Sequence, residues 1–463
     1  MSARRSVPSA ASIADSVREG QVTASEVIEA ALARIAADNP KLNAFTTVLA
    51  DRARATARAH DDARSRGAAL GPLAGVPFAV KNLFDVAGIA TLAGSRINRD
   101  HPAAIRDAVL VERLEAAGAV LVGALNMGEY AYDFTGENQH YGPSRNPLDT
   151  ARMTGGSSGG SAGAVAAGLV PIALGSDTNG SIRVPASFCG IFGLKPTYGR
   201  LPRTGTFPFV DSLDHLGHFA RSVKDLALAY DAMQGHDAGD AACAERPAAP
   251  ALPRLLGATR KWNVAVAGAY FIDGANAQAL EALDRVATAL DAKVRIELDH
   301  ARIARAAAYL ITTTEGAALH LERLRTRAAD LEPIVRDRLI SGAMVPAQVV
   351  AKAQKFRAVF RRSVLAALES HDAIIALCAP CTAPLIGQQM LELGGRSVPL
   401  RANVGLYTQP ISFIGLPVVA VPVPLSPLPV GVQIITAPWR EDIGLQIAAA
   451  LERDGVVATA RPG

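Results

Sequence analysis

Apolar runs bounded by glycine or proline alternate with amphipathic segments through the first half of the chain. The apolar runs at 73–84, 119–123 and 169–176 are typical of buried strands. Between the first two runs, the segment 107–118 has the periodicity of an amphipathic helix that ends at Gly118. Strands that alternate with helices predict an α/β fold in which helices cover both faces of a sheet.

The same alternation returns near the C-terminus, where the strand-like runs HDAIIALCAP, GLPVVAVPVP and PVGVQIIT precede the helix-like segment EDIGLQIAAALERDG. Residues 270–370 are rich in arginine and in helical periodicity, whereas 235–254 has the composition of a loop or linker. We therefore expect a single domain over 1–463, made of N-terminal helices at about 8–60, a core at about 61–235 and 371–455, and a helical insertion at about 270–370.

The first of the longer predicted helices has signals at both ends. Thr23 followed by Glu26 forms a capping box, and apolar residues then repeat on one helix face. Pro40 is expected to end this helix, because proline lacks the N–H that the next turn needs.

Composition narrows the class of protein. The 463 residues include 47 basic and 43 acidic side chains, and the resulting net charge of +4 is too small and too evenly spread to indicate direct binding of nucleic acid. Only eight of the basic residues are lysines, so arginine carries nearly all of the positive charge. Four cysteines in a chain of this length do not make a disulfide framework.

Neither a secretory signal nor a membrane span is expected. The opening residues MSARRSVPSAASIADS contain two arginines but no apolar segment behind them. The longest uncharged apolar stretch, 161–176, is interrupted by Gly168 and Pro171 and is too short to cross a bilayer. We therefore expect a cytoplasmic protein that does not associate with membranes.

The stretch GGSSGGS at 155–161 has three possible interpretations. A flexible linker is disfavoured because apolar helix-like and strand-like residues follow within a few positions. A phosphate-binding loop is disfavoured because the sequence contains no lysine between Lys81 and Lys195. The pattern G-x-S-x-G would make Ser157 the nucleophile of a hydrolase elbow, but that elbow needs an apolar strand before the serine, and RNPLDTARMT lacks one.

A second serine has a more suitable context. In GSDTNGSIRVPAS, at 175–187, glycines free the backbone so that the amides of Thr178, Asn179, Gly180 and Ser181 can converge on one point. Consecutive amides of this kind bind anions, including the oxyanion that forms during acyl transfer. The hydroxyl of Ser181 is therefore a candidate nucleophile.

A serine nucleophile needs a base. The HLGH motif at 215–218 has neither the glutamate nor the spacing of a zinc protease motif and is more typical of structural histidines. Lys81 lies in the apolar run PFAVKNLF, in a chain that otherwise uses arginine for its positive charge. A desolvated lysine can lose its proton and act as a base, although a lysine whose stem is buried and whose amine reaches solvent stays an alternative.

A buried lysine, GGSSGGS, and a D-T-x-G-S-x-R-x-P-A turn together resemble the amidase signature family. The resemblance extends over about residues 10–452 and includes the segments 71–88, 123–132, 142–200 and 427–436. It implies an amidase-signature fold, with a large mixed β-sheet core covered by helices on both faces. It also implies a catalytic triad of Lys81 as base, Ser157 as a bridging serine after a cis peptide bond, and Ser181 as the nucleophile that forms an acyl-enzyme.

The same resemblance assigns the amides of 178–181 to the oxyanion hole and implies neither a metal nor a cofactor. From the residues alone, Asp177 and Arg183 are expected to stabilise the turn as an ion pair. Cys378 and Cys381 form a CAPC motif typical of redox proteins, but we interpret them as incidental thiols.

Within the family, the chain looks most similar to the carboxybiuret hydrolases of cyanuric acid degradation. This branch hydrolyses a C–N bond of a small carboxylated urea, releases ammonia and works with a small partner protein. We also expect the chain to form a homodimer or a heterotetramer. A glutamine-hydrolysing component of a tRNA amidotransferase is the alternative. The chain departs from the wider family at Gly128, near the expected substrate pocket, and at His218, while His320 and Arg325 are candidates for binding a substrate carboxylate.

Overall fold

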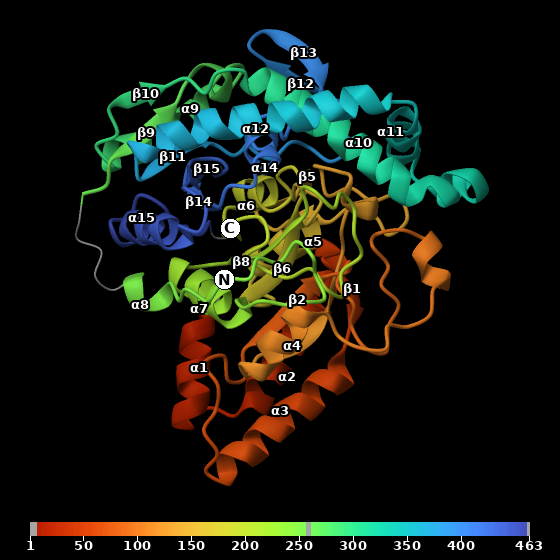
Figure 1. Cartoon of the computed structure of the whole chain (residues 1–463). Helices are drawn as coiled ribbons and strands as arrows, with labels where there is room; N and C mark the ends of the chain where they lie inside the picture. The colour runs from red at the N-terminus through yellow and green to blue at the C-terminus, as the bar shows by residue number, and fades with distance from the viewer. Residues whose placement is uncertain (1–6, 256–260, 461–463) are drawn as a thin grey trace.

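The computed structural model describes residues 7–255 and 261–460. Within these residues, one large mixed sheet of eleven strands runs through the molecule in the order β1-β3-β2-β6-β8-β7-β14-β15-β11-β9-β10 (Figure 1). Its strands are β1 (Phe45–Val48), β2 (Pro77–Lys81), β3 (Val120–Leu125), β6 (Ile172–Asp177), β7 (Phe192–Lys195), β8 (His215–Ala220), β9 (Val264–Ala267), β10 (Val294–Ile296), β11 (Ala373–Leu377), β14 (Val418–Val423) and β15 (Val430–Ile435). The α/β fold with a large mixed sheet is therefore confirmed.

The strand directions place two chain segments at the same edge of this sheet. Strand β2 pairs in parallel with β3 on one side and with β6 on the other, and the register with β6 sets Val80 opposite Leu174. Strands β6, β8, β7, β14 and β15 then pair antiparallel in turn. Because β2 and β6 are parallel neighbours, the residues at their carboxyl ends lie side by side.

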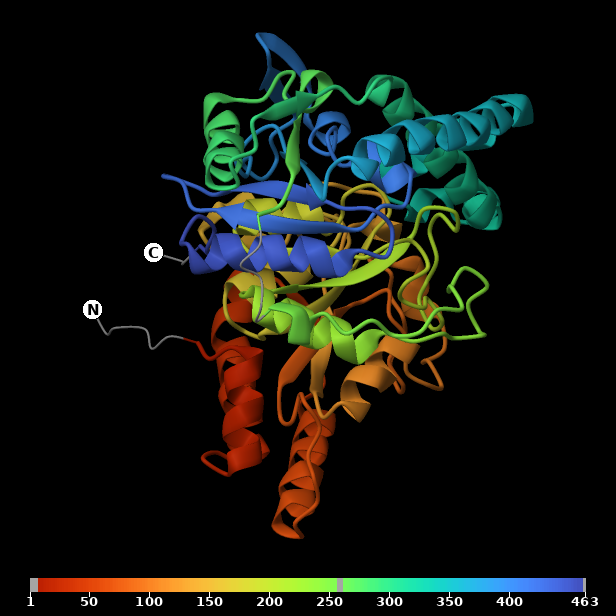
Figure 2. The same cartoon turned by 60° about the vertical axis from the view of Figure 1, so that its left-hand side comes forward.

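Helices surround the sheet and also extend from it. Helices α7 and α15 pack together over β8 and β14, whereas α5 and α6 pack together against β6 and β15. The helices are α1 (Ala10–Glu19), α2 (Ala24–Leu42), α3 (Ala50–Ser65), α4 (Val109–Ala116), α5 (Gly159–Ala166), α6 (Arg183–Cys189), α7 (Val223–Met233), α8 (Leu252–Leu255), α9 (Ala277–Ala289), α10 (Ala301–Thr326), α11 (Pro333–Ala343), α12 (Ala347–Glu369), α13 (Leu400–Asn403), α14 (Gln409–Phe413) and α15 (Glu441–Arg453). Figure 2 shows α1 and α3 projecting at one end of the molecule and α10 to α12 gathered at the other.

The predicted helical insertion is largely helical. Helices α9, α10, α11 and α12 lie in it, but strand β10 lies in it as well and extends the central sheet by pairing with β9. The division into one domain with an insertion stays a prediction, and its span of 1–463 includes residues 1–6, 256–260 and 461–463, which lie outside the described residues.

Most of the local predictions are confirmed, with two corrections. Thr23 and Glu26 form the expected capping box, but Pro40 does not end α2, which continues to Leu42. A proline this close to the end costs only one backbone hydrogen bond, and the helix ends instead at Leu42, where the left-handed backbone of Asn43 (φ 50°) forms the C-cap. A strand does precede Ser157, but this strand, β5 (Asp149–Met153), forms a separate small hairpin with β4 (Arg145–Asn146) and is not part of the central sheet. An isolated bridge also joins Arg152 of β5 to Leu385.

Candidate active site

Lys81 is the last residue of β2, and its side chain is fully buried. Its Nζ atom lies 2.6 Å from Ser157 Oγ and 2.9 Å from Ser176 Oγ. Ser176 is near the end of β6, the parallel neighbour of β2, so the sheet itself brings this hydroxyl to the amine. The structure thus joins two of the predicted catalytic residues directly and adds a third hydroxyl that the sequence did not identify.

Burial lowers the pKa of Lys81 from 10.5 to about 7, and the negative charges of Asp214, Asp177 and Asp133 oppose this effect in part. The amine is therefore about half neutral near pH 7. A neutral amine in contact with a hydroxyl can accept its proton, which is the chemistry of a general base.

Ser157 lies between the β4–β5 hairpin and α5, and it is also fully buried. The peptide bond between Gly156 and Ser157 is cis. Backbone hydrogen bonds flank this peptide on both sides: Gly128 donates its N–H to the carbonyl of Ser157 (3.1 Å), and Gly156 donates its N–H to the carbonyl of Phe134 (2.8 Å). The backbone of Ser157 is thus anchored on both sides, with its hydroxyl beside Lys81.

Ser181 lies in the turn between β6 and α6, four residues after the end of the strand. Gly180 has φ of 140°, and a Cβ there would lie 2.1 Å from Thr408 Oγ1, so only glycine fits. Thr408 Oγ1 in turn donates to the carbonyl of Asn179 (2.7 Å) and fixes the orientation of this turn. Among the described residues, the backbone N–H groups of 178–181 donate no hydrogen bond to a backbone carbonyl in a loop, turn or cap. These N–H groups are therefore available to an oxyanion.

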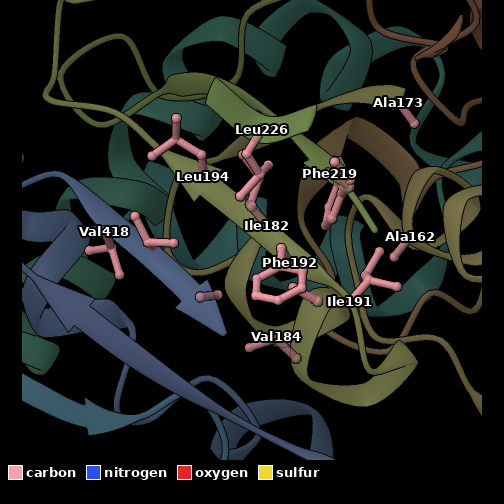
Figure 3. Packing of buried hydrophobic residues seen from close by; sticks show 14 of the residues in the cluster. Ala162, Ala173, Ile182, Val184, Ile191, Phe192, Leu194, Phe219, Leu226 and Val418 are labelled. Carbon is pink, nitrogen blue, oxygen red and sulfur yellow. The ribbon is translucent and has the colours of Figure 1, made fainter. Parts of the chain in front are cut away.

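Asp177 and Arg183 form the expected ion pair, and both side chains are fully buried. Burial raises the pKa of Asp177, but the Arg183 guanidinium opposes this more strongly, so the net effect lowers its pKa below the ordinary value. Arg183 also donates to Gln433 Oε1 (2.6 Å). The neighbours of Ser181, Ile182 and Val184, point into the apolar core (Figure 3), so ionic and apolar contacts both anchor the turn.

The hydroxyls of Ser157 and Ser181 form no hydrogen bond with one another among the described residues. Both nevertheless belong to segments at the same edge of the sheet. Catalytic hydrogen bonds often tighten only when substrate is bound, so this geometry is compatible with a relay between the two serines.

A cavity of about 680 Å³ opens onto Ser181. It is enclosed by the turn after β6, by the segment 131–134, by α10 and α11, and by residues near α13. Its lining includes Thr178, Asn179, Ser181, Asp133, Tyr309, Thr312, Gln409 and four arginines, namely Arg302, Arg305, Arg338 and Arg401. A second cavity of about 400 Å³ contains Ser176 and Asp214 and shares Ala131, Thr178 and Phe209 with the first.

The predicted specificity residues lie in different surroundings. Gly128 contacts the segment of Ser157 through its backbone, since its N–H bonds to the carbonyl of Ser157. His320 is fully buried between Tyr130 and Phe207 and does not line the large cavity. Burial, assisted by the charge of Arg323, lowers its pKa to about 3, so it is neutral and unsuited to binding a carboxylate. Arg325 is exposed in the last turn of α10 and also lies outside the cavity.

The remaining motifs of the sequence lie away from this cavity. His215 and His218 are buried in strand β8, and burial lowers the pKa of His218 to about 4. Cys378 and Cys381 are free and buried, and burial raises the pKa of both thiols.

One cluster of possible metal ligands was not predicted. Glu129, His140 and Glu332 bring ligand atoms within 4.8 Å of one another. These groups already bond among themselves, because Glu129 lies 3.0 Å from His140 Nε2 and accepts the N–H of Glu332. No sequence motif joins them, since Glu332 lies about 200 positions from the other two.

None of the helices in 7–255 and 261–460 is long and apolar enough to span a membrane.

Comparisons with known proteins identify the family of the chain. The family model described as Amidase matches residues 26–444. The chain is 52% identical over 447 residues to the AtzE component of the 1-carboxybiuret hydrolase of Pseudomonas sp. (strain ADP), covering 96% of this chain and 98% of that protein. It is 39% identical to a component of the glutamyl-tRNA(Gln) amidotransferase of Anaeromyxobacter sp. (strain K), covering 94% and 93%.

A solved structure of an unexpected vestigial protein complex, which reveals the evolutionary origins of an s-triazine catabolic enzyme, is also similar. Its TM-score is 0.96 at 51% identity, over 98% of this chain and 100% of that chain.

Proposed function

The chain belongs to the amidase family, and on this basis we propose that it hydrolyses a C–N bond of a small carboxylated urea of the 1-carboxybiuret class and releases ammonia. The observation that carries the proposal is the fully buried Lys81, whose Nζ lies 2.6 Å from Ser157 at the same sheet edge as Ser181. The identity of 52% with a component of a 1-carboxybiuret hydrolase supports this substrate class.

Each proton in the proposed reaction has a donor and an acceptor. Neutral Lys81 takes a proton from Ser157, which takes one from Ser181, and the Ser181 oxygen attacks the amide carbonyl carbon. The amides of 178–181 stabilise the resulting oxyanion. The proton returns through Ser157 to the leaving nitrogen, the C–N bond breaks, and ammonia departs. Water then attacks the acyl-enzyme, so that one amide and one water yield one acid and one ammonia.

The cavity offers cations for a substrate carboxylate. Of its four arginines, Arg401 pairs with both Asp133 and Glu137, and Arg302 pairs with Asp273. Arg305 donates to Gln409, Asn403 and the carbonyl of Ala402, and Arg338 donates to the carbonyl of Tyr132. Within the described part of the chain, these last two carry a charge that no carboxylate neutralises. Arg305 and Arg338 are therefore the proposed carboxylate ligands, in place of His320 and Arg325.

We also propose that the chain works with a small partner protein. We further propose that the chain forms a homodimer or a heterotetramer and that it acts in the cytoplasm. Two relatives support an association with another chain, since one is a hydrolase subunit and the other belongs to a protein complex. The proposal involves no direct contact with nucleic acid and no cofactor.

One assay separates this function from its alternative. Ammonia release is measured from carboxybiuret, biuret, allophanate, glutamine and simple amides, with and without a co-expressed small partner protein. The proposal predicts that carboxybiuret gives the highest kcat/KM. Hydrolysis of glutamine alone would instead support the amidotransferase-like function, which the 39% identity with an amidotransferase component makes the second candidate.

A further inference from the structure

Asp133 and Arg401 form an ion pair between the loop 133–136 and the rim of the large cavity. The Asp133 side chain is 2% exposed, and its Oδ1 accepts a hydrogen bond from Arg401 (2.7 Å). Its Oδ2 accepts from the backbone N–H and the hydroxyl of Thr135 and from the N–H of Gly136. Because donors already surround both oxygens, this carboxylate is a structural acceptor rather than a ligand for substrate.

The loop 133–136, which the hydrogen bonds of Asp133 close, contacts the segment of Ser157 and the segment of Ser181. The carbonyl of Phe134 accepts the N–H of Gly156, the residue before Ser157 (2.8 Å). The Phe134 ring lies against Gly180, because a Cβ there would be 3.3 Å from Phe134 Cε1. One short loop therefore supports the backbone of the bridging serine and the backbone of the oxyanion turn.

Asp133 also lies against two glycines next to Ser157. These are Gly156, which precedes the cis peptide bond, and Gly128, whose N–H bonds to the carbonyl of Ser157. A Cβ on Gly156 would be 3.1 Å from Asp133 Oδ2, and a Cβ on Gly128 would be 2.7 Å from Asp133 Cβ. Since Gly128 donates its N–H to the carbonyl of Ser157, the missing side chain at this position makes room for Asp133. The departure from the family pattern at Gly128 is thus spatially linked to Asp133.

Arg401 comes from a distant part of the chain. It lies in α13, directly after the hairpin of β12 (Met390–Leu393) and β13 (Arg396–Pro399), which Figure 1 shows at the periphery of the molecule. Arg401 itself lines the large cavity, and so do its neighbours Pro399 and Ala402. The ion pair consequently joins the rim of the cavity to the loop 133–136, whose Phe134 carbonyl accepts the N–H of Gly156.

We propose that Asp133 and Arg401 are a positioning pair that holds the Ser157 peptide and the Gly180 turn in the geometry that acyl transfer needs. The inference rests on the proposed function, because it assumes the Lys81–Ser157–Ser181 relay. Neither residue touches the reacting atoms. They act through the loop 133–136, which fixes the distance between the bridging serine and the oxyanion amides.

Asp133→Asn is the sharpest test, because it preserves the shape of the side chain. The amide replaces one acceptor oxygen by a donor, so that an N–H must face either Arg401 or the amides of Thr135 and Gly136. We expect kcat to fall roughly 10- to 100-fold, with KM changed by less than about threefold, because misplaced catalytic groups lower the rate more than binding. Arg401→Ala should show a similar loss that millimolar guanidinium partly restores.

A pH profile distinguishes this role from a general loss of folding. The negative charge of Asp133 supports protonation of Lys81, together with Asp214 and Asp177. Asp133→Asn should therefore move the acid limb of kcat/KM to lower pH while lowering the maximum. The matched control is Asp225→Asn, because Asp225 is equally buried and each of its oxygens accepts one N–H, from Ala10 and Ala11, in a different part of the fold. This control should keep kcat and the acid limb unchanged.

A second readout does not depend on the substrate. Phenylmethanesulfonyl fluoride forms an O–S bond with an activated serine, fluoride leaves, and the hydroxyl proton passes to the relay. The rate of this reaction at Ser181 should fall in Asp133→Asn and Arg401→Ala by about the same factor as kcat. If wild type hydrolyses no carboxylated urea but this loss is seen, the proposed function fails and the positioning role stands. Reaction at the wild-type rate in both variants, or a rise in KM with unchanged kcat, would overturn the positioning role.

Discussion

The pH dependence of Lys81 gives the most quantitative prediction. With a pKa of about 7, the amine changes from protonated to neutral within the range in which the enzyme can be assayed. Only the neutral amine can accept the proton of Ser157, so activity should rise with pH and reach half of its maximum near pH 7. Lys81→Arg replaces this amine by a guanidinium that stays protonated.

The size of the effect follows from the pKa. At pH 7, a lysine with the ordinary pKa of 10.5 would be neutral in only about one molecule in 3,000, whereas Lys81 is neutral in about half. Burial at the end of β2 therefore raises the population of the active base roughly a thousandfold. We expect Lys81→Arg and Lys81→Met to lower kcat at pH 7 by at least about this factor, since neither side chain can accept the proton.

The measurement is the initial rate of ammonia release between pH 5.5 and pH 9.5, expressed as kcat/KM. Lys195 offers a matched control because it is also fully buried, and burial lowers its pKa well below the ordinary value. Its amine bonds to the backbone carbonyls of Pro196 and Leu416 rather than to a serine. Lys195→Met should leave the acid limb in place. A flat profile through pH 7 in wild type, or more than a tenth of the activity in Lys81→Arg, would refute the neutral-base role.

Three further predictions concern other groups of the site. Ser157→Ala should lower kcat at least about 1,000-fold with an unchanged thermal unfolding midpoint, and a loss below tenfold would exclude an essential bridging role. Arg338→Gln should raise KM about tenfold or more for a carboxylated urea but not for an uncharged amide, and equal effects on both substrates would argue against a carboxylate ligand. Burial raises the pKa of Glu332 to about 7, so wild type should lose up to about 3 kcal/mol of stability as pH rises from 4.5 through 7. Glu332→Gln should abolish that loss in denaturant titrations, and an unchanged slope would show that another group is responsible.

Much of this site could be predicted because its chemistry is concentrated in short segments. A lysine in an apolar run is conspicuous in any sequence, and Lys81 is indeed buried at a strand end. The turn around Ser181 can likewise be recognised from its glycines, because few other residues can adopt the backbone conformation that Gly180 has. The ion pair of Asp177 and Arg183 follows from their spacing across the same turn.

The cavity could not be predicted in the same way. Its cations come from α10, α11 and α13, more than 120 positions after Ser181, and nothing in the sequence distinguishes an arginine that faces the cavity from one that faces solvent. His320 illustrates the difficulty, since it lies on α10 like Arg305 but on a face that packs against Tyr130. Ser176 was missed for another reason, because its contact with Lys81 depends on the register between two strands 95 positions apart.

The central claim is that Ser181 becomes acylated during turnover. The direct measurement is acid quenching of the enzyme with carboxybiuret, followed by intact-mass analysis and peptide mapping. The account predicts an acyl adduct on the peptide that contains Ser181, formed together with the first equivalent of ammonia and absent from Ser181→Ala. An adduct on Ser157, or an adduct and turnover that persist in Ser181→Ala, would contradict it.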